Sequence, residues 1–365
     1  MAPTAINLPN NLSEDLSLQQ AGIKLPTQIN PTESESTETD PIPPLRAALT
    51  SETTPLAVRF RALFSLKYHA SLKPPDRTTL PAIEAIAAAF PSPSALLKHE
   101  LAYCLGQSGN SAAVPHLQSV LKDQKEDGMC RHEAAEALGA LCDEGSLPLL
   151  REYCHDEAEV VRETCEIAVG RIEWAISGKR KTERLRDSDF ASIDPAPPLA
   201  QNTHRYSIPE MQQKLLDNKL PLFERYRAMF ALRDLASPPD LPTAVPAVHA
   251  LASGFSDPSA LFRHEVAFVF GQLSHPASIP SLVEVLGRPH EAPMVRHEAA
   301  EALGSLGEED GVEEILKRYL NDEEQIVRDS VIVALDMAEF ERSGQMEYAA
   351  IPEENSFSPM ARVKG

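Results

Sequence analysis

The sequence predicts an all-α protein, an α-solenoid of helical hairpins in two duplicated halves of about four repeats each. The first observation is that the second half copies the first. The residues RHEAAEALG occur at 131–139 and again at 296–304, and PSALLKHELAYCLGQ at 93–107 matches PSALFRHEVAFVFGQ at 258–272. The second observation is that Ala and Leu recur at spacings of three and four residues, which is typical of helices. Strand signals are nearly absent, so tandem helical units are the expected architecture.

A shorter period lies inside each half, where a basic residue precedes each helical run. These residues, 31 to 39 positions apart, are Arg59, Lys98, Arg131 and Arg162 in the first half and Arg225, Arg263, Arg296 and Arg328 in the second. Each unit has room for two helices, and the pattern resembles HEAT repeats.

Two pairs of residues are predicted to start the second long helix of each half. Ser92-Pro93 and Asp257-Pro258 each offer an N-cap residue followed by proline, which is favoured at the first helical position. Gly106 and Gly271 stand where these helices could end.

Segments without apolar periodicity divide the chain. Residues 1–45 are rich in Ser, Thr, Glu, Asp and Pro and are predicted to form a disordered acidic tail. Two HEAT-like halves are expected at 46–177 and 208–341, joined by a linker at 178–207 with a charged start and a Pro-rich middle. A second tail is expected at 342–365.

Composition limits the classes of partner. The formal net charge is −20, from 34 basic and 54 acidic residues, which disfavours nucleic-acid binding and favours a basic partner. No stretch has the pattern of a signal peptide or the roughly 18–20 apolar residues of a membrane helix. The five cysteines lack paired spacing, which is typical of reduced thiols in a cytosolic protein.

A basic cluster at 179–181 bears on the expected location. It fits a localisation signal, although a solvated linker is the favoured interpretation. We therefore expect a cytoplasmic protein, with the nucleus as a second location.

The repeats differ at the position after the basic residue. The two central units of each half carry a His-Glu dipeptide there, whereas the outer units carry other residues. The four dipeptides are His99-Glu100, His132-Glu133, His264-Glu265 and His297-Glu298. A single histidine on a helix is usually a structural or surface residue. Four dipeptides at equivalent positions, absent from half of the units, instead indicate a shared chemical role.

The spacing of these dipeptides suits a metal. Neighbouring packed helices lie about 8–10 Å apart, so histidines at matching positions can reach a shared ion through bonds of about 2 Å. One added glutamate gives the two-His-one-carboxylate set of oxygen-activating iron sites, and the duplication supplies a second set. No cysteine recurs at these positions, which disfavours a thiolate zinc site.

A zinc-protease interpretation of the HEAAE segments fails. The HExxH motif needs a second histidine where Glu136 and Glu301 stand. These two glutamates are interpreted as solvated or as supporting a ligand.

The four dipeptides, with SALLKHELAYCLGQ and RHEAAEALG, resemble the deoxyhypusine hydroxylase family from about residue 45 to 340. The resemblance implies a non-haem di-iron monooxygenase that binds two Fe²⁺ ions and uses O₂ as co-substrate. Its substrate would be the deoxyhypusine side chain of translation initiation factor 5A, which it would hydroxylate to hypusine. The protein would act as a monomer, without nucleic-acid or membrane partners.

The same resemblance assigns roles to individual residues. The implied metal ligands are His99, His132 and Glu133 for one iron, and His264, His297 and Glu298 for the other. The remaining glutamates, Glu100 and Glu265, would bind the amines of the substrate. Spacing does not distinguish the two glutamate roles, and no catalytic side chain is expected beyond the metal centre.

Two other functions compete with this one. A non-enzymatic HEAT-repeat adaptor, the usual role of such arrays, would bind no metal. A dinuclear zinc hydrolase would use the same ligands for a different ion. The halves are predicted to face each other, and a separation of the two sets by more than about 10 Å would exclude a shared dinuclear centre.

Overall fold

The computed structural model describes residues 40–185, 188–200 and 206–343, which form helices and connecting segments without a β-strand. The predicted tandem array is confirmed, because eight helix pairs, four in each half, follow one another in this part of the chain. The first helices of the pairs form an outer layer: α1 (Ile42–Thr50), α3 (Thr79–Ala87), α5 (Val114–Lys122), α7 (Leu147–Tyr153), α10 (Ile208–Leu216), α12 (Ala244–Ala252), α14 (Ile279–Leu286) and α16 (Val312–Lys317).

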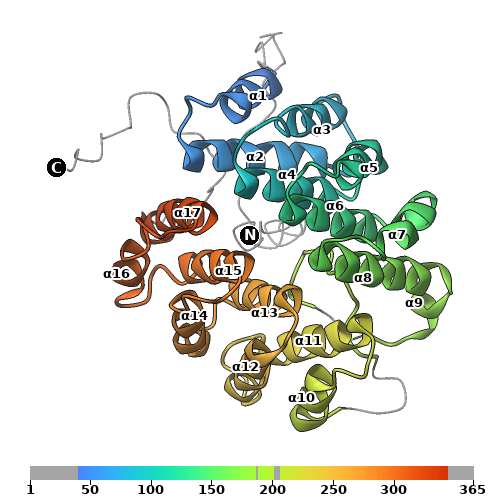
Figure 1. Cartoon of the computed structure of the whole chain (residues 1–365), viewed down its shortest axis with the longest axis vertical. Helices are drawn as coiled ribbons and strands as arrows, with labels where there is room; N and C mark the ends of the chain where they lie inside the picture. Colours follow the sequence, from blue (N-terminus) through green and yellow to red (C-terminus); the bar gives the residue numbers. More distant parts are fainter. Residues whose placement is uncertain (1–39, 186–187, 201–205, 344–365) are drawn as a thin grey trace, which may run out of the picture.

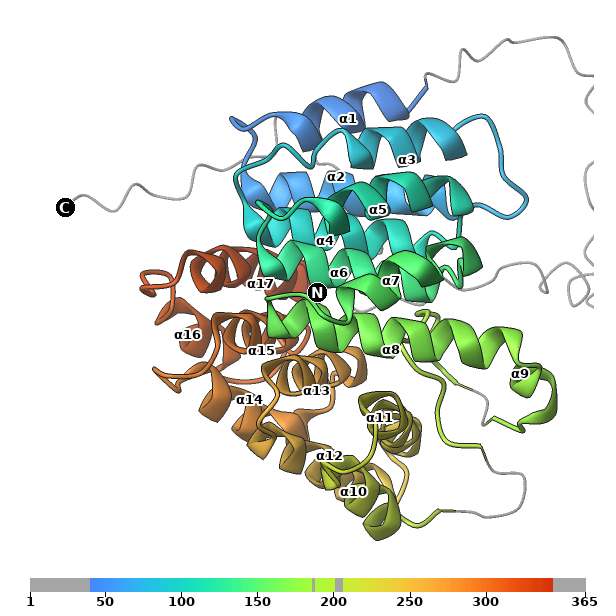
Figure 2. The same ribbon diagram turned by 45° about the vertical axis from the view of Figure 1, so that its right-hand side comes forward.

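The second helices of the pairs form an inner layer, on which the two halves face each other (Figure 1). They are α2 (Leu56–Ala70), α4 (Ala95–Gln107), α6 (Gly128–Ala140), α8 (Glu159–Ile176), α11 (Leu222–Ala236), α13 (Ala260–Leu273), α15 (Pro293–Gly304) and α17 (Gln325–Ser343). In the first half, the outer helices lie in a row over the inner ones (Figure 2).

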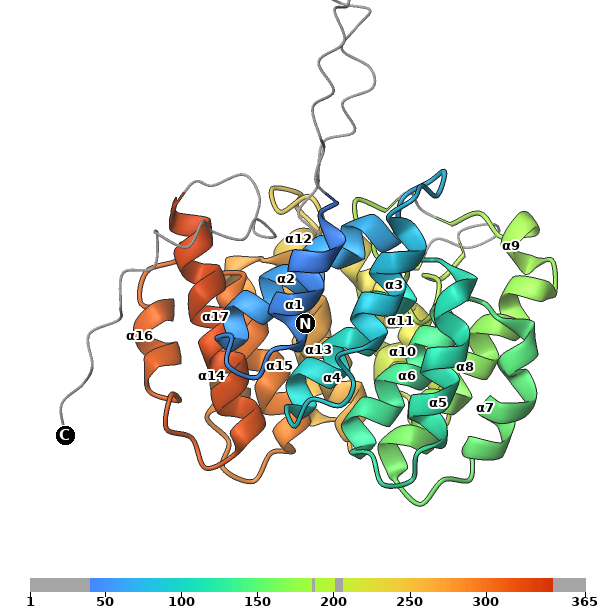
Figure 3. The ribbon, with the colours of Figure 1, turned by 90° about the horizontal axis from the view of Figure 1, so that it is seen from above.

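The two halves close on each other at both ends. Helix α8 contacts α11 and α13, and α17 contacts α2 and α4. The contacts are reciprocal, because Ser94 Oγ donates to Asp329 Oδ2 at 3.3 Å and Ser259 Oγ donates to Glu163 Oε2 at 2.7 Å. The inner layer therefore forms a closed ring. Figure 3 shows the two halves from above.

The arginine that opens RHEAAEALG has a structural role. Arg131 is buried on α6, and its Nε donates to the carbonyl of Leu121, near the end of the preceding outer helix. Its terminal nitrogens form a bidentate ion pair with Asp156, at 3.1 and 2.5 Å. The same bond to a carbonyl ten residues earlier recurs for Arg59, Arg225 and Arg296. These arginines tie four of the eight outer helices to their inner partners.

The predicted starts of α4 and α13 are wrong by two residues. Their N-caps are Ser94 and Ser259, whose Oγ atoms accept from Leu97 N at 3.2 Å and Phe262 N at 3.0 Å. Ser92 instead binds Arg59 through its hydroxyl. The Ser-Pro-Ser and Asp-Pro-Ser segments each offer two capping residues, and the long-range arginine pairing decides which one caps the helix.

Gly106 does not end α4, which continues to Gln107. A Cβ built on Gly106 would lie 2.7 Å from Ala137 Cβ and 2.8 Å from Ala137 Cα on α6. Two other glycines, each two helical turns after a dipeptide, make the same close approach: Gly139 to Ala168 and Gly304 to Ala334. Glycine at this position therefore lets neighbouring inner helices approach closely enough for their dipeptides to meet.

We expect Gly106→Val to destabilise the fold by roughly 1–3 kcal/mol, the usual result of overpacking, because α4 must move away from α6. Urea unfolding measures this change in free energy. Gly128→Ala is the matched control, since a Cβ there meets its neighbours at an ordinary 3.6 Å. Equal stability of the two variants would contradict the close-packing role.

The predicted linker is largely ordered in its described residues. Its basic start forms a short exposed helix, α9 (Lys179–Thr182), and Pro195 to Leu199 are buried. We call residues 188–200 the strap. Gln107 makes two hydrogen bonds to the backbone of Ile193, at 3.0 and 2.8 Å, and Gln272 donates to Ser192 Oγ at 2.8 Å. Gln107 and Gln272 are equivalent in the duplication, so the strap joins the ends of α4 and α13.

An ion pair anchors the strap. The fully buried Arg233 binds Asp194 through two hydrogen bonds of 2.7 and 2.8 Å. Its guanidinium also lies over the rings of Phe190 and Phe230, with Asp234 Oδ1 2.9 Å from Nη2. The predicted linker thus contains an anchored strap, while its basic cluster at 179–181 is exposed.

The predicted tails mostly lie outside the described residues. Helix α1 begins at Ile42, so residues 42–45 belong to the fold rather than to the predicted tail at 1–45. Helix α17 continues to Ser343, two residues into the predicted tail at 342–365. In the described ranges, no helix combines the length and apolar character required to span a membrane.

Candidate metal centre

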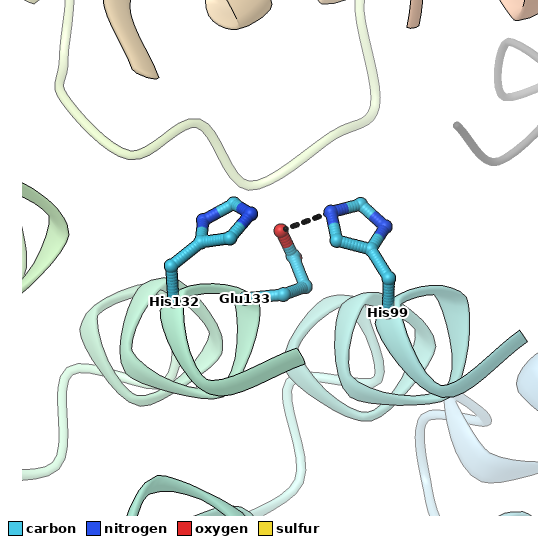
Figure 4. A group of neighbouring side chains, drawn as sticks. All are labelled: His99, His132 and Glu133. Atoms are coloured by element: carbon cyan, nitrogen blue, oxygen red, sulfur yellow. Dashed lines mark ion pairs between the residues drawn. The ribbon is translucent and has the colours of Figure 1, made fainter. Parts of the chain in front are cut away.

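The four His-Glu dipeptides lie on neighbouring inner helices. His99 and Glu100 are on α4, and His132 and Glu133 are on α6. The second half repeats this placement with α13 and α15, and all eight side chains are buried. Figure 4 shows His99 and His132 pointing the same way from adjacent helices, with Glu133 between them.

The histidines of both halves converge. The ring centroids of His99 and His132 are 5.3 Å apart, and those of His264 and His297 are 5.4 Å apart. Between the halves, His99 lies 5.8 Å from His264 and 5.6 Å from His297. The two sets are therefore well inside the separation of about 10 Å beyond which they could not form a shared dinuclear centre.

Each half brings two histidines and one glutamate within reach of one ion. Glu133 Oε2 lies 3.2 Å from His99 Nε2, and Glu298 Oε2 lies 3.4 Å from His264 Nε2. The candidate ligand atoms of each set lie within 4.8 Å of one another. The sets are the two triplets named by the sequence: His99, His132 and Glu133, and His264, His297 and Glu298.

A hydroxyl on the next inner helix fixes the tautomer of His132. Thr164 Oγ1 donates its only hydrogen to Val160 O at 2.8 Å. The same oxygen lies 3.5 Å from His132 Nδ1, so it accepts from that nitrogen, which must carry the proton. The lone pair is then on His132 Nε2, which is buried and has no hydrogen-bond partner among the described residues. A neutral imidazole with an unpartnered lone pair is the form that binds a metal.

The second half uses the same device with serine. Ser330 Oγ donates to Glu301 Oε1 at 2.9 Å and lies 3.4 Å from His297 Nδ1. His297 Nε2 is likewise buried without a hydrogen-bond partner in the described part of the chain. Glu301 is thus joined to His297 through Ser330, and it is buried rather than solvated.

We expect Thr164→Val and Ser330→Ala each to weaken metal binding by roughly 10–100-fold, the usual effect of losing a partner that orients a ligand. Both variants remove the acceptor for a histidine Nδ1–H without removing a candidate ligand. Competition with a chelator measures the affinity. Thr50→Val, at an exposed hydroxyl on α1, is the control. Unchanged affinity in both site variants would show that the hydroxyls do not orient the histidines.

The electrostatics of the centre favour bound cations. Burial lowers the pKa of His99, His132 and His297 well below the usual histidine value, so these imidazoles are neutral at pH 7. Burial also raises the pKa of Glu133 to about 8. A buried carboxylate without a positive partner is costly, and divalent ions would compensate this charge.

The two glutamates predicted to meet substrate are also buried at the centre. Burial raises the pKa of Glu100, and that of Glu265 rises well above its usual range. Burial raises the pKa of Glu136 in the same way, with Glu133 adding to the effect. Glu136 therefore belongs to this acidic surrounding rather than to the open surface.

Sequence reasoning missed the hydroxyls of Thr164 and Ser330. The signal was present, because both stand at the glutamate position of the fourth unit in their half. A hydroxyl at this position can be recognised as a partner of the histidine only when the fourth unit is known to pack against the third. The strap was also missed, since its burial depends on contacts with both halves.

The comparisons with known proteins agree with this architecture. A family model described as HEAT repeats matches residues 80–170 and 248–336. A human deoxyhypusine hydroxylase structure, in complex with glycerol, is 43% identical, with a TM-score of 0.73, over 82% of this chain and 96% of that one. The fold and the site thus define a HEAT-repeat protein with two paired groups that could hold metal ions.

Curated relatives give the family. A deoxyhypusine hydroxylase of Phaeosphaeria nodorum is 70% identical over 86% of this chain and 95% of its own length. One from Aspergillus fumigatus is 66% identical over 89% of this chain and 98% of its own. The chain belongs to the deoxyhypusine hydroxylase family and is an enzyme. This membership excludes the alternative of a non-enzymatic adaptor.

Proposed function

We propose that this enzyme hydroxylates the deoxyhypusine side chain of translation initiation factor 5A to hypusine, using O₂ and two bound Fe²⁺ ions. The observation that carries the proposal is the convergence of four imidazoles from both halves, with ring centroids of neighbouring pairs 5.3 to 5.8 Å apart. Each pair is accompanied by one glutamate, and two histidines with one carboxylate are typical of oxygen-activating Fe²⁺ sites. The name of the relatives supports the same reaction.

The protein would contribute the ligands and their environment. His99, His132 and Glu133 would hold one ion, and the equivalent residues of the second half would hold the other. Bound iron supplies the redox chemistry with O₂. The hydroxyls of Thr164 and Ser330 keep their histidines in the metal-binding tautomer. Burial of all these groups keeps bulk water away from the reacting carbon.

Glu100 and Glu265 would bind the substrate. The deoxyhypusine side chain carries amine groups on a flexible aliphatic stem, and each amine can donate to a carboxylate. Two carboxylates at fixed positions would hold the stem so that one carbon faces the ions. The net charge of −20 would attract a basic region of the partner protein.

Zinc is the alternative ion, since it binds the same ligands, and a dinuclear zinc hydrolase is the competing function. Metal analysis of protein purified without added metal separates the two. We expect about two iron ions per chain, and the gain of one oxygen atom by a deoxyhypusine-bearing protein in the presence of O₂. Zinc in place of iron, or turnover that survives removal of iron, would contradict the proposal.

Location and assembly are part of the proposal. We propose that the enzyme acts as a monomer in the cytoplasm, with the nucleus as a second location. Both metal sets come from one chain, which supports a monomer. Fluorescence microscopy of the tagged chain and light scattering of the purified enzyme test these two points.

A further inference from the structure

A contact rule runs through the inner layer. The residue at the Glu position of the dipeptide in one unit contacts the residue at the His position of the dipeptide in the preceding unit. Glu133 lies 3.2 Å from His99, and Thr164 lies 3.5 Å from His132. The second half repeats both contacts at 3.4 Å. The rule therefore gives a partner to the two remaining glutamates, in the first unit of each half.

These partners differ between the halves. For Glu100 the rule gives Phe60 on α2, and for Glu265 it gives Tyr226 on α11. Phe60 and Tyr226 are equivalent residues and both are fully buried. The ring position is thus shared, but only the second half carries a hydroxyl at the position that the rule places next to the remaining glutamate.

The Tyr226 hydroxyl has no hydrogen-bond partner among the described residues. Its ring is held in place by Phe262 and Phe230, with centroids 5.7 and 6.4 Å away. Burial raises the pKa of Tyr226 well above its usual range, and Glu265 is the charged side chain that adds most to this rise. The phenol therefore stays protonated. A buried hydroxyl without a protein partner costs free energy unless something else binds it.

The charges around the two glutamates also differ. Glu136, Glu133, Glu298 and Asp194, all acidic, act on Glu265. In the first half, Glu298 also acts on Glu100, but the ammonium of Lys67 opposes it there. The equivalent cation in the second half, Arg233, is already paired with Asp194 and Asp234. The more negative end of the centre is therefore the one that holds Glu265.

We infer that Tyr226 is a substrate-positioning residue that, together with Glu265, receives the terminal primary ammonium of the deoxyhypusine side chain. This inference rests on the proposed function. A primary ammonium has three N–H donors, so it can donate to the phenol oxygen and to the carboxylate at once. The secondary amine of the side chain has fewer donors and fits Glu100, whose neighbour Phe60 offers no acceptor. The asymmetry fixes which way round the substrate lies.

The test is Tyr226→Phe, which removes one oxygen atom and keeps the ring. We expect KM for the deoxyhypusine-bearing protein to rise roughly 10–100-fold, the effect of losing a hydrogen bond to a charged group, with kcat and iron content unchanged. The thermal midpoint should not fall, because the lost hydroxyl has no protein partner. Tyr319→Phe, a half-buried tyrosine beside the outer helix α16, is the matched control.

A second arm uses a substrate whose terminal amine is replaced by a methyl group. Its binding should be weaker than that of the natural side chain in both proteins, but the penalty should be roughly 10–100-fold smaller in Tyr226→Phe, where Glu265 alone still receives the ammonium. An unchanged KM in Tyr226→Phe, or equal penalties for the analogue in both proteins, would overturn the inference. Failure of the proposed function looks different, because the unsubstituted enzyme would then lack iron or turnover, while calorimetric binding of the two side chains would still report on Tyr226.

Discussion

Replacing His297 by alanine is expected to leave a folded protein that holds fewer than two irons and has lost at least about 100-fold of its hydroxylase activity, a larger effect than loss of an orienting partner. The reason is the geometry around His297 Nε2, a buried nitrogen with no hydrogen-bond partner in the described chain. Its ring lies 5.4 Å from that of His264 and 5.6 Å from that of His99. In the described chain, only His99, His132, His264 and His297 belong to the two ligand sets, so no further histidine stands in for His297.

The measurement combines iron per chain, by elemental mass spectrometry, with mass analysis of the product. The control is His116→Ala, which removes a partly exposed histidine paired with the exposed Glu84 on an outer helix. His116→Ala should retain both irons and full activity. An active, iron-loaded His297→Ala variant would remove this histidine from the ligand set.

Replacing Asp194 by alanine is expected to lower the free energy of unfolding by roughly 3 kcal/mol, the low end for breaking a buried ion pair. Arg233 is fully buried and would lose two hydrogen bonds of 2.7 and 2.8 Å. Asp234 remains within 2.9 Å, which keeps the loss at that low end. The strap would also lose its anchor to α11.

Urea unfolding of the purified enzyme measures this change. Asp189→Ala is the matched control, because Asp189 lies in the same strap and its hydrogen bond among the described residues is an exposed one, accepted from Ser237. We expect the control to change stability by less than about 0.5 kcal/mol. If Asp194→Ala and Asp189→Ala unfold alike, Asp194 does not anchor the strap.

The sequence was sufficient for the repeat architecture because the duplication can be read directly. Comparing equivalent units also separated His132 from residues that recur for packing, such as Leu138, which lies in the core. That comparison needs no structure, since it asks only which residues are present in some units and absent from others. The composition of the candidate site follows from the same comparison.

The features that escaped prediction depend on contacts between distant segments. Ser94 caps α4, rather than Ser92, because Ser92 is used by Arg59 from the preceding unit. In the sequence, Asp194 is one of several charged linker residues, and only the structure shows that it pairs with Arg233. The face-to-face arrangement of the halves was predicted. The distances between the histidines of the two halves could not be, because they depend on how the ring closes.

The closed ring also has the symmetry of a dimer. Ser94 of the first half binds Asp329 of the second, and the equivalent Ser259 of the second half binds Glu163 of the first. This is the reciprocal pattern of an isologous twofold interface. A homodimer of one half would reproduce the four histidines, but its two ends would be identical and would bind an asymmetric side chain in either direction. Fusion into one chain lets the ends diverge, as they have at Phe60 and Tyr226. The duplication preserved the paired ligand sets while giving the centre a direction.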